Sequence, residues 1–135
     1  VDGMQDATSW AERQTMRAKA DVLRERGNRK DAMALYTILA ENTMTEEGAE
    51  AYYRLVEESF LAGNYTDVEK RVYALGECGS MYWQAKMFLT LGDVLAKGGN
   101  TFQARATYQS IVDGYTPKDD GIVAEAKQRI ATLAK

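Results

Sequence analysis

Three stretches of this sequence decide its fold: GNRKDAMALY at 27–36, GNYTDVEKRV at 63–72 and GNTFQARATY at 99–108. Each stretch opens with Gly-Asn, and successive copies lie 36 residues apart. The residues that keep the same register around them are Ala32, Val68 and Ala104, then Tyr36, Val72 and Tyr108, and, before the glycines, Met16, Tyr52 and Phe88. A period of roughly 20–50 residues is typical of stacked helical arrays. The repeat therefore predicts an elongated fold whose units pack on their neighbours.

Each period predicts two helices joined at the Gly-Asn turn. Glycine accepts the left-handed conformation that often ends a helix, and asparagine is a good cap for the helix that follows. Ser80 and Thr45 are expected N-caps of first helices, and Thr116 with Pro117 at the first helical position is expected to start the last helix. The predicted units are residues 8–43, 45–78 and 80–115, followed by a terminal helix at 117–134. We therefore expect seven helices, no strands and one domain over residues 1–135.

Composition and charge exclude several classes of function. The 17 basic and 20 acidic residues are intermixed, with a net charge of −3, so no basic face for nucleic acid is predicted. No apolar run approaches the roughly 20 residues that span a bilayer, and no signal-peptide pattern is present. Because the chain begins at Val1 rather than Met, we expect a processed form or a segment of a longer protein.

The residue types needed for common catalytic and metal sites are missing. The sequence contains no histidine, which removes the commonest general base and metal ligand. Cys78 is the single cysteine, so neither an intrachain disulfide nor a cysteine metal cluster is possible. We interpret Cys78 as a loop or helix-edge residue, with a redox or intermolecular role as the alternative. The sequence predicts no enzyme, cofactor or metal site.

The residues at this spacing resemble the tetratricopeptide repeat (TPR), a unit of two antiparallel helices. The third unit matches best, and its matching residues are Phe88, Leu91, Gly92, Leu95, Gly99, Asn100, Ala104 and Tyr108. The first unit has Lys19 where leucine is usual, and the second has Val72 in place of the aromatic residue. The resemblance implies a right-handed α-solenoid. The long period resembles the subtype common in bacterial cell-envelope proteins, which slightly favours the periplasm or envelope as the location.

In the TPR family a concave groove is lined mainly by the first helix of each unit. By register, this resemblance implies a groove made of Gln14, Arg17, Asp21, Arg24, Glu50, Tyr53, Glu57, Phe60, Lys86, Leu89, Asp93, Lys97, Glu125 and Arg129. Asp21, Glu57 and Asp93 share one register position, so they form an acidic column if the units stack. The column is interpreted either as a track for a cationic or amide-rich peptide or as a solvated face with local pairs. The expected local pairs are Arg17–Asp21 and Asp93–Lys97.

Two functions remain open from the sequence. The first is a non-enzymatic scaffold that binds a peptide or helix of a partner protein in the groove. A clamp for a C-terminal carboxylate is disfavoured, because acids stand where the family's clamp needs asparagine. The second is a structural segment of a longer solenoid, or a homo-oligomer, with no groove ligand. Trp10 has no preceding unit to cover its ring, which is the feature that points to self-association or a longer parent chain.

Overall fold

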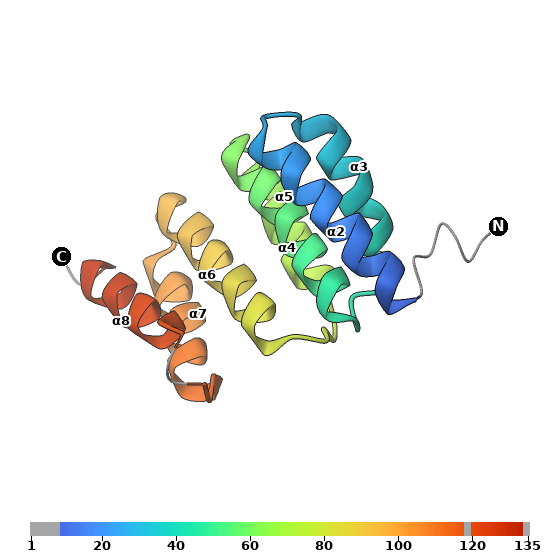
Figure 1. Ribbon diagram of the computed structural model, residues 1–135. Helices are drawn as coiled ribbons and strands as arrows, with labels where there is room; N and C mark the ends of the chain where they lie inside the picture. Colours follow the sequence, from blue (N-terminus) through green and yellow to red (C-terminus); the bar gives the residue numbers. More distant parts are fainter. Residues whose placement is uncertain (1–8, 118–119, 134–135) are drawn as a thin grey trace. The chain divides into compact units, whose positions relative to one another are not determined.

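The computed structural model describes residues 9–117 and 120–133, and over these ranges it contains seven α-helices and no strand. Figure 1 shows the helices in chain order. Their bounds are α2 (Trp10–Glu25), α3 (Arg29–Leu39), α4 (Glu46–Leu61), α5 (Tyr65–Ala74), α6 (Met81–Lys97), α7 (Thr101–Gly114) and α8 (Ile122–Leu133). The all-helical prediction is confirmed for the described residues.

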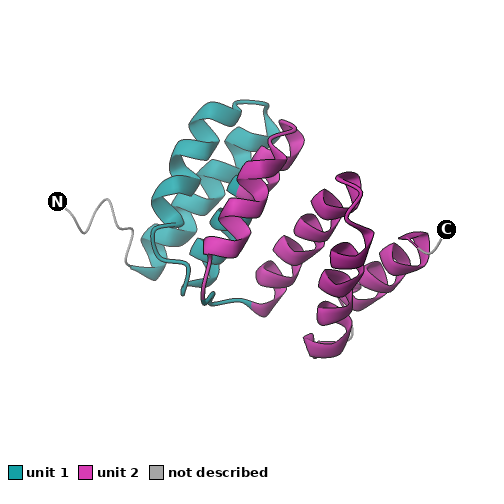
Figure 2. Cartoon of the chain, turned by 180° about the vertical axis from the view of Figure 1, so that it is seen from behind, with its two compact units in different colours: residues 1–55, 77–80 teal, residues 56–76, 81–135 magenta. Residues whose placement is uncertain are grey.

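The chain divides into two compact units, drawn in different colours in Figure 2. Unit 1 comprises Val1–Leu55 and Glu77–Ser80, and unit 2 comprises Val56–Gly76 and Met81–Lys135. Helix α4 therefore contributes its first part to unit 1 and its end to unit 2. In unit 1, α2 packs along α3, and in unit 2, α6 packs against α5, α7 and α8.

The three Gly-Asn turns share one backbone geometry. Gly27, Gly63 and Gly99 have φ angles of 84°, 78° and 82°, in the left-handed region that favours glycine. The amide of each following asparagine donates to the carbonyl five residues earlier, at 2.8 to 2.9 Å. This pattern satisfies carbonyls that the end of a helix would otherwise leave unpaired. The identical turns explain why the helices of each pair reverse direction at the predicted positions.

Caps fix where most of the helices begin. The Ser9 hydroxyl accepts from the Glu12 amide and the Glu12 carboxylate accepts from the Ser9 amide, which makes a capping box for α2. The Thr45 hydroxyl accepts from the Gly48 amide at 2.9 Å, so Thr45 caps α4 as predicted. The side chains of Asn64 and Asn100 each accept the amide of the third residue on, at 3.3 Å. Asn28 differs, because its amide group donates to the Asp31 carboxylate.

The predicted start of the last helix at Pro117 is wrong. Helix α8 begins at Ile122, after Gly121, whose φ of 83° interrupts a helical path. The Asp120 carboxylate accepts from the Ile122 amide at 3.1 Å and from the Tyr115 hydroxyl, so it serves as the cap that Thr116 was expected to provide. The predicted start of the first unit at residue 8 and the predicted helix end at residue 134 lie outside the described residues.

The cores of the two units contain the register positions read from the sequence. In unit 1 the buried cluster consists of Ala20, Ala32, Tyr36, Leu39 and Ala51. In unit 2 the equivalent buried residues include Val68, Val72, Leu95, Ala104, Tyr108 and Ile111, with Ile122 and Ala126 from α8. The aromatic rings expected in the core behave unequally, because Tyr36 and Tyr108 are fully buried whereas Tyr52 and Phe88 are half-buried.

Candidate interaction surfaces

A tyrosine–aspartate hydrogen bond recurs at the same register position in both units. In unit 1 the hydroxyl of Tyr36 on α3 donates to Asp21 on α2, and in unit 2 the hydroxyl of Tyr108 on α7 donates to Asp93 on α6 at 2.5 Å. Both rings are buried, with 0% and 2% of their surface exposed. A buried hydroxyl without an acceptor is costly. Asp21 and Asp93 therefore act first as acceptors for the buried phenols.

An arginine joins each Tyr–Asp pair, but it comes from a different helix in the two units. In unit 1, Arg24 donates to the Tyr36 hydroxyl at 3.1 Å and lies 3.8 Å from the Asp21 carboxylate. In unit 2, Arg129 on α8 donates to Asp93 at 2.9 Å and pairs with Glu125 at 3.3 Å. Residue 129 follows Asp93 by one repeat length, so the acidic column is continued by an arginine. The local pairs Arg17–Asp21 and Asp93–Lys97 are replaced by these contacts.

The middle repeat lacks this cluster, because Val72 occupies the tyrosine position. Its polar contact is made elsewhere in unit 2, where Ser59 donates to Asp67 at 2.5 Å and Arg71 pairs with Asp67 at 2.8 Å. The hydrogen bonds from Ser59 and then Arg71 lower the pKa of Asp67. Glu57, the acid of the column in this repeat, is half-buried.

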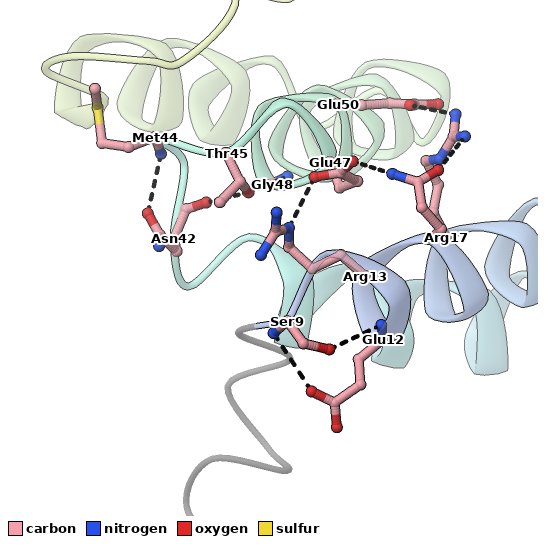
Figure 3. Close-up of polar contacts among 11 residues, drawn as sticks. Ser9, Glu12, Arg13, Arg17, Asn42, Met44, Thr45, Glu47, Gly48 and Glu50 are labelled. Carbon is pink, nitrogen blue, oxygen red and sulfur yellow. Dashed lines mark hydrogen bonds and ion pairs between the residues drawn. The ribbon is translucent and has the colours of Figure 1, made fainter.

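Unit 1 contains an ion-pair network between α2 and the first turns of α4, shown in Figure 3. Arg13 pairs with Glu47 at 2.9 Å, and Gln14 donates to the same carboxylate. Arg17 pairs with Glu50 at 3.3 Å, and Arg54 reaches Glu50 from the next turn of α4 at 3.7 Å. Both glutamates are buried, with 6% and 5% exposure. The network therefore links α2 to α4 through charge-assisted hydrogen bonds.

The two buried glutamates have opposite pKa shifts. Burial by itself would raise the pKa of Glu47. The net shift is downward, because the carboxylate accepts hydrogen bonds from Arg13 and the backbone and lies near the charges of Arg13 and Arg17. Burial, together with the charge of Asp21, raises the pKa of Glu50 despite its arginine partners. The Glu47 side of the network therefore favours the charged state, whereas the Glu50 side opposes it.

The residues predicted to line a groove are not all accessible. Tyr53, Glu50 and Leu89 are buried, with 7%, 5% and 3% exposure. The half-buried members of the predicted set are Gln14, Arg17, Asp21, Arg24, Glu57, Phe60, Lys86, Asp93, Glu125 and Arg129, and Lys97 is exposed. Sequence reasoning missed Arg13, Glu47 and Arg54. A signal for them was present in the sequence. Arg13 and Arg17 are four residues apart, and Glu47 and Glu50 are three apart, so each pair lies on one face of its helix.

One hollow in unit 2 gathers several of the predicted groove residues. It has a volume of about 290 Å³ and is lined by Phe60, Asp93, Ala96, Lys97, Tyr108, Arg129, Thr132 and Leu133. These residues come from the end of α4 and from α6, α7 and α8. Phe60 also stacks at a tilt on Tyr65, with ring centroids 5.5 Å apart. The hollow thus combines an apolar lining with charged groups from two helices.

Cys78 lies in the loop between α5 and α6, as predicted, and is half-buried. Burial raises the pKa of its thiol, and the thiol donates a hydrogen bond to the Ser80 carbonyl at 3.5 Å. The next residue, Gly79, donates its amide to the Thr43 carbonyl at 2.7 Å. A thiol with a raised pKa is a poor nucleophile at neutral pH, so the position supports the interpretation of Cys78 as a loop residue.

Within residues 9–117 and 120–133, no three side chains of the types His, Cys, Asp and Glu gather as a metal site would require. None of the described helices has the length and hydropathy needed to cross a bilayer.

Comparisons with protein-family models, with curated proteins and with solved structures give no match to this chain.

Proposed function

We propose that this chain is a non-enzymatic interaction module of the tetratricopeptide kind, which binds a peptide or helix of a partner protein through the first helices of its repeats. The observation that supports this most is the recurrence of one hairpin design every 36 residues, with the same glycine φ geometry in all three turns and the Tyr–Asp bond in the first and third repeats. Repeat folds of this kind present extended binding surfaces. The envelope location is an expectation that depends on the long period alone.

The distribution of charged groups also favours binding over catalysis. The acids whose pKa is shifted, Glu47, Glu50 and Asp67, are all engaged with arginines. Structural ion pairs of this kind shift pKa values without implying chemistry. With no histidine in the sequence, the side chains most often used for proton transfer at neutral pH are lacking.

The test is selection of a random peptide library, displayed on phage, on the full chain. We expect a family of related peptides to be enriched, and a labelled consensus peptide to bind saturably with one-to-one stoichiometry. A matched selection on the chain unfolded in urea controls for adhesion to exposed apolar residues. If no related sequences are enriched on the folded chain, the proposal is wrong.

A structural role is the second candidate, and Trp10 supports it. Its side chain is 67% exposed at the start of α2. A hollow of about 420 Å³ in the same unit is lined by Ala11, Glu12, Thr15, Met16, Lys19 and Leu35. An exposed tryptophan is suited to an interface. Sedimentation velocity over a wide concentration range would show association that Trp10→Ser removes if this role is correct, and an unchanging monomer would count against self-association.

A further inference from the structure

The two complete repeats differ at a register position that lines the hollow in unit 2. In unit 1 that position is Arg24, whose side chain reaches the Tyr36 hydroxyl and the Asp21 carboxylate. In unit 2 the same position is Ala96, which lines the hollow with little more than a methyl group. Arg129 from α8 supplies the cation for Asp93 instead. The hollow is therefore lined by a small side chain at the position where unit 1 has an arginine.

The charge beside this position is also reversed between the repeats. Glu25 of α2 corresponds to Lys97 of α6, one residue beyond Arg24 and Ala96 respectively. Lys97 is exposed and lines the hollow, and its ammonium group has no ion pair or hydrogen bond among the described residues. Asp93 is already occupied by Tyr108 and Arg129, and Arg129 also pairs with Glu125. Of the charged side chains that line the hollow, Asp93 and Arg129 pair with each other, whereas Lys97 has no partner among the described residues.

We propose that the hollow receives an apolar side chain of leucine or phenylalanine size from a partner protein, followed closely by an aspartate or glutamate that pairs with Lys97. This inference depends on the proposed function and specifies its partner as an acidic amphipathic segment. The apolar lining from Phe60, Ala96 and Leu133 favours burial of an aliphatic or aromatic group. The free ammonium group selects for a neighbouring carboxylate. A cationic peptide is disfavoured at this site, because Asp93 already accepts hydrogen bonds from Tyr108 and Arg129.

The experiment uses two substitutions that place residues of unit 1 at the equivalent positions of unit 2. Ala96→Arg fills the hollow, and Lys97→Glu reverses the charge at its rim. Both residue types are accommodated at the same register in α2. Lys127→Glu, at an exposed position of α8 that does not line the hollow, is the matched charge control. Circular dichroism checks that each variant keeps its helicity.

Phage-displayed random peptides are selected in parallel on the full chain and on the three variants, and labelled consensus peptides are then titrated by fluorescence anisotropy. We expect the native pool to be rich in apolar–acidic pairs, and its consensus peptide to bind about tenfold or more weakly to Ala96→Arg and Lys97→Glu. Lys127→Glu should bind as the native chain does. The Lys97→Glu pool should instead be enriched in apolar–basic pairs.

Four results would overturn the proposal. If the selected peptides bind Ala96→Arg and Lys97→Glu as tightly as they bind the native chain, the module binds partners elsewhere and only this inference fails. If no peptide family is enriched at all, the proposed function fails with it. A native pool rich in basic residues contradicts the assigned charge. Dimerisation of the native chain that Ala96→Arg abolishes would assign the hollow to a second copy of the chain. If Ala96→Arg loses helicity, Lys97→Glu still decides the question.

Discussion

The Tyr108 hydroxyl donates to the Asp93 carboxylate at 2.5 Å, and the same bond joins Tyr36 to Asp21 two repeat lengths earlier. Both tyrosines come from the second helix of a hairpin and both acids from the first. Two of the three acids of the predicted column, Asp21 and Asp93, therefore also help to hold together the two helices of their own hairpins. Charge reversal at Asp93 would disturb folding as well as binding, which makes neighbouring Lys97 the cleaner site at which to test recognition.

Removing the Tyr108 hydroxyl should destabilise the protein. In Tyr108→Phe the Asp93 carboxylate loses a donor while its other donor, Arg129, remains. We expect the free energy of unfolding to fall by about 1–3 kcal/mol, the usual cost of losing a hydrogen bond to a charged group. Urea denaturation followed by circular dichroism measures this. Tyr73→Phe, at a ring that is 65% exposed, is the control and should be neutral; equal effects would contradict the assignment.

Tyr36 in unit 1 should make the free energy of unfolding depend on pH in the alkaline range. Burial, and then the hydrogen bond to Asp21, raise the pKa of Tyr36 from 10.0 to about 12. Because the unfolded phenol ionises first, its contribution is complete below pH 10 and is lost as the pH rises towards 12. We expect the native chain to lose stability across this window more steeply than Tyr36→Phe. Parallel curves for the two proteins would contradict the account.

The buried glutamates of Figure 3 should respond to acid in opposite directions. The lowered pKa of Glu47 means that its contribution is present above the ordinary value of 4.5 and is lost as the pH falls through its folded-state pKa. The raised pKa of Glu50 means that protonation favours the folded state, so its contribution improves as the pH falls from neutral. Glu47→Gln should therefore flatten the loss of stability in acid, whereas Glu50→Gln should steepen it.

Urea titrations of the native chain and both variants at a series of pH values between 3 and 7 measure these slopes. In addition, Glu47→Ala should cost about 3 kcal/mol at neutral pH, because it removes the buried carboxylate to which both Arg13 and Gln14 donate. Slopes that change in the same direction for both glutamine variants would show that the electrostatic assignment is wrong.

Gly92 should not tolerate a larger residue. A Cβ atom at this position would lie 2.3 Å from the Tyr108 ring, which is itself fully buried. Gly92→Ala should therefore displace the ring and cost about 1–3 kcal/mol. Gly114→Ala is the matched control, because a Cβ atom there meets nothing within 4 Å and the residue lies in α7. We expect the control to be neutral or slightly stabilising, as measured by thermal denaturation. A neutral Gly92→Ala would contradict the packing.

The local features of the fold were predictable from the sequence, because they depend on residues close together in the chain. The turns at Gly27, Gly63 and Gly99 and the caps at Thr45, Asn64 and Asn100 each follow from residue type and a spacing of a few positions. The start of α8 was not predicted, because Asp120 and Gly121 outweigh the helix-starting preference of Pro117.

The features that depend on how one helix faces another were not predictable. Arg13 and Glu47 are 34 residues apart, and their pairing depends on the rotation of α2 against α4. The same limit applies to Tyr52 and Tyr53. Tyr52 was expected in the core but is half-buried, whereas Tyr53 was expected in the groove but is buried. The sequence alone shows that Ala96 occupies the register position of Arg24. Its consequence required the positions of Arg129 and Leu133 on α8.

The most direct test of the account is a heteronuclear NMR titration of the full chain with the selected consensus peptide. We expect the largest chemical-shift changes on the residues of the unit 2 hollow, with Phe60, Ala96, Lys97 and Leu133 foremost among them. Changes confined to surfaces outside the hollow, such as the exposed Tyr73 on α5 and Phe102 on α7, would contradict it.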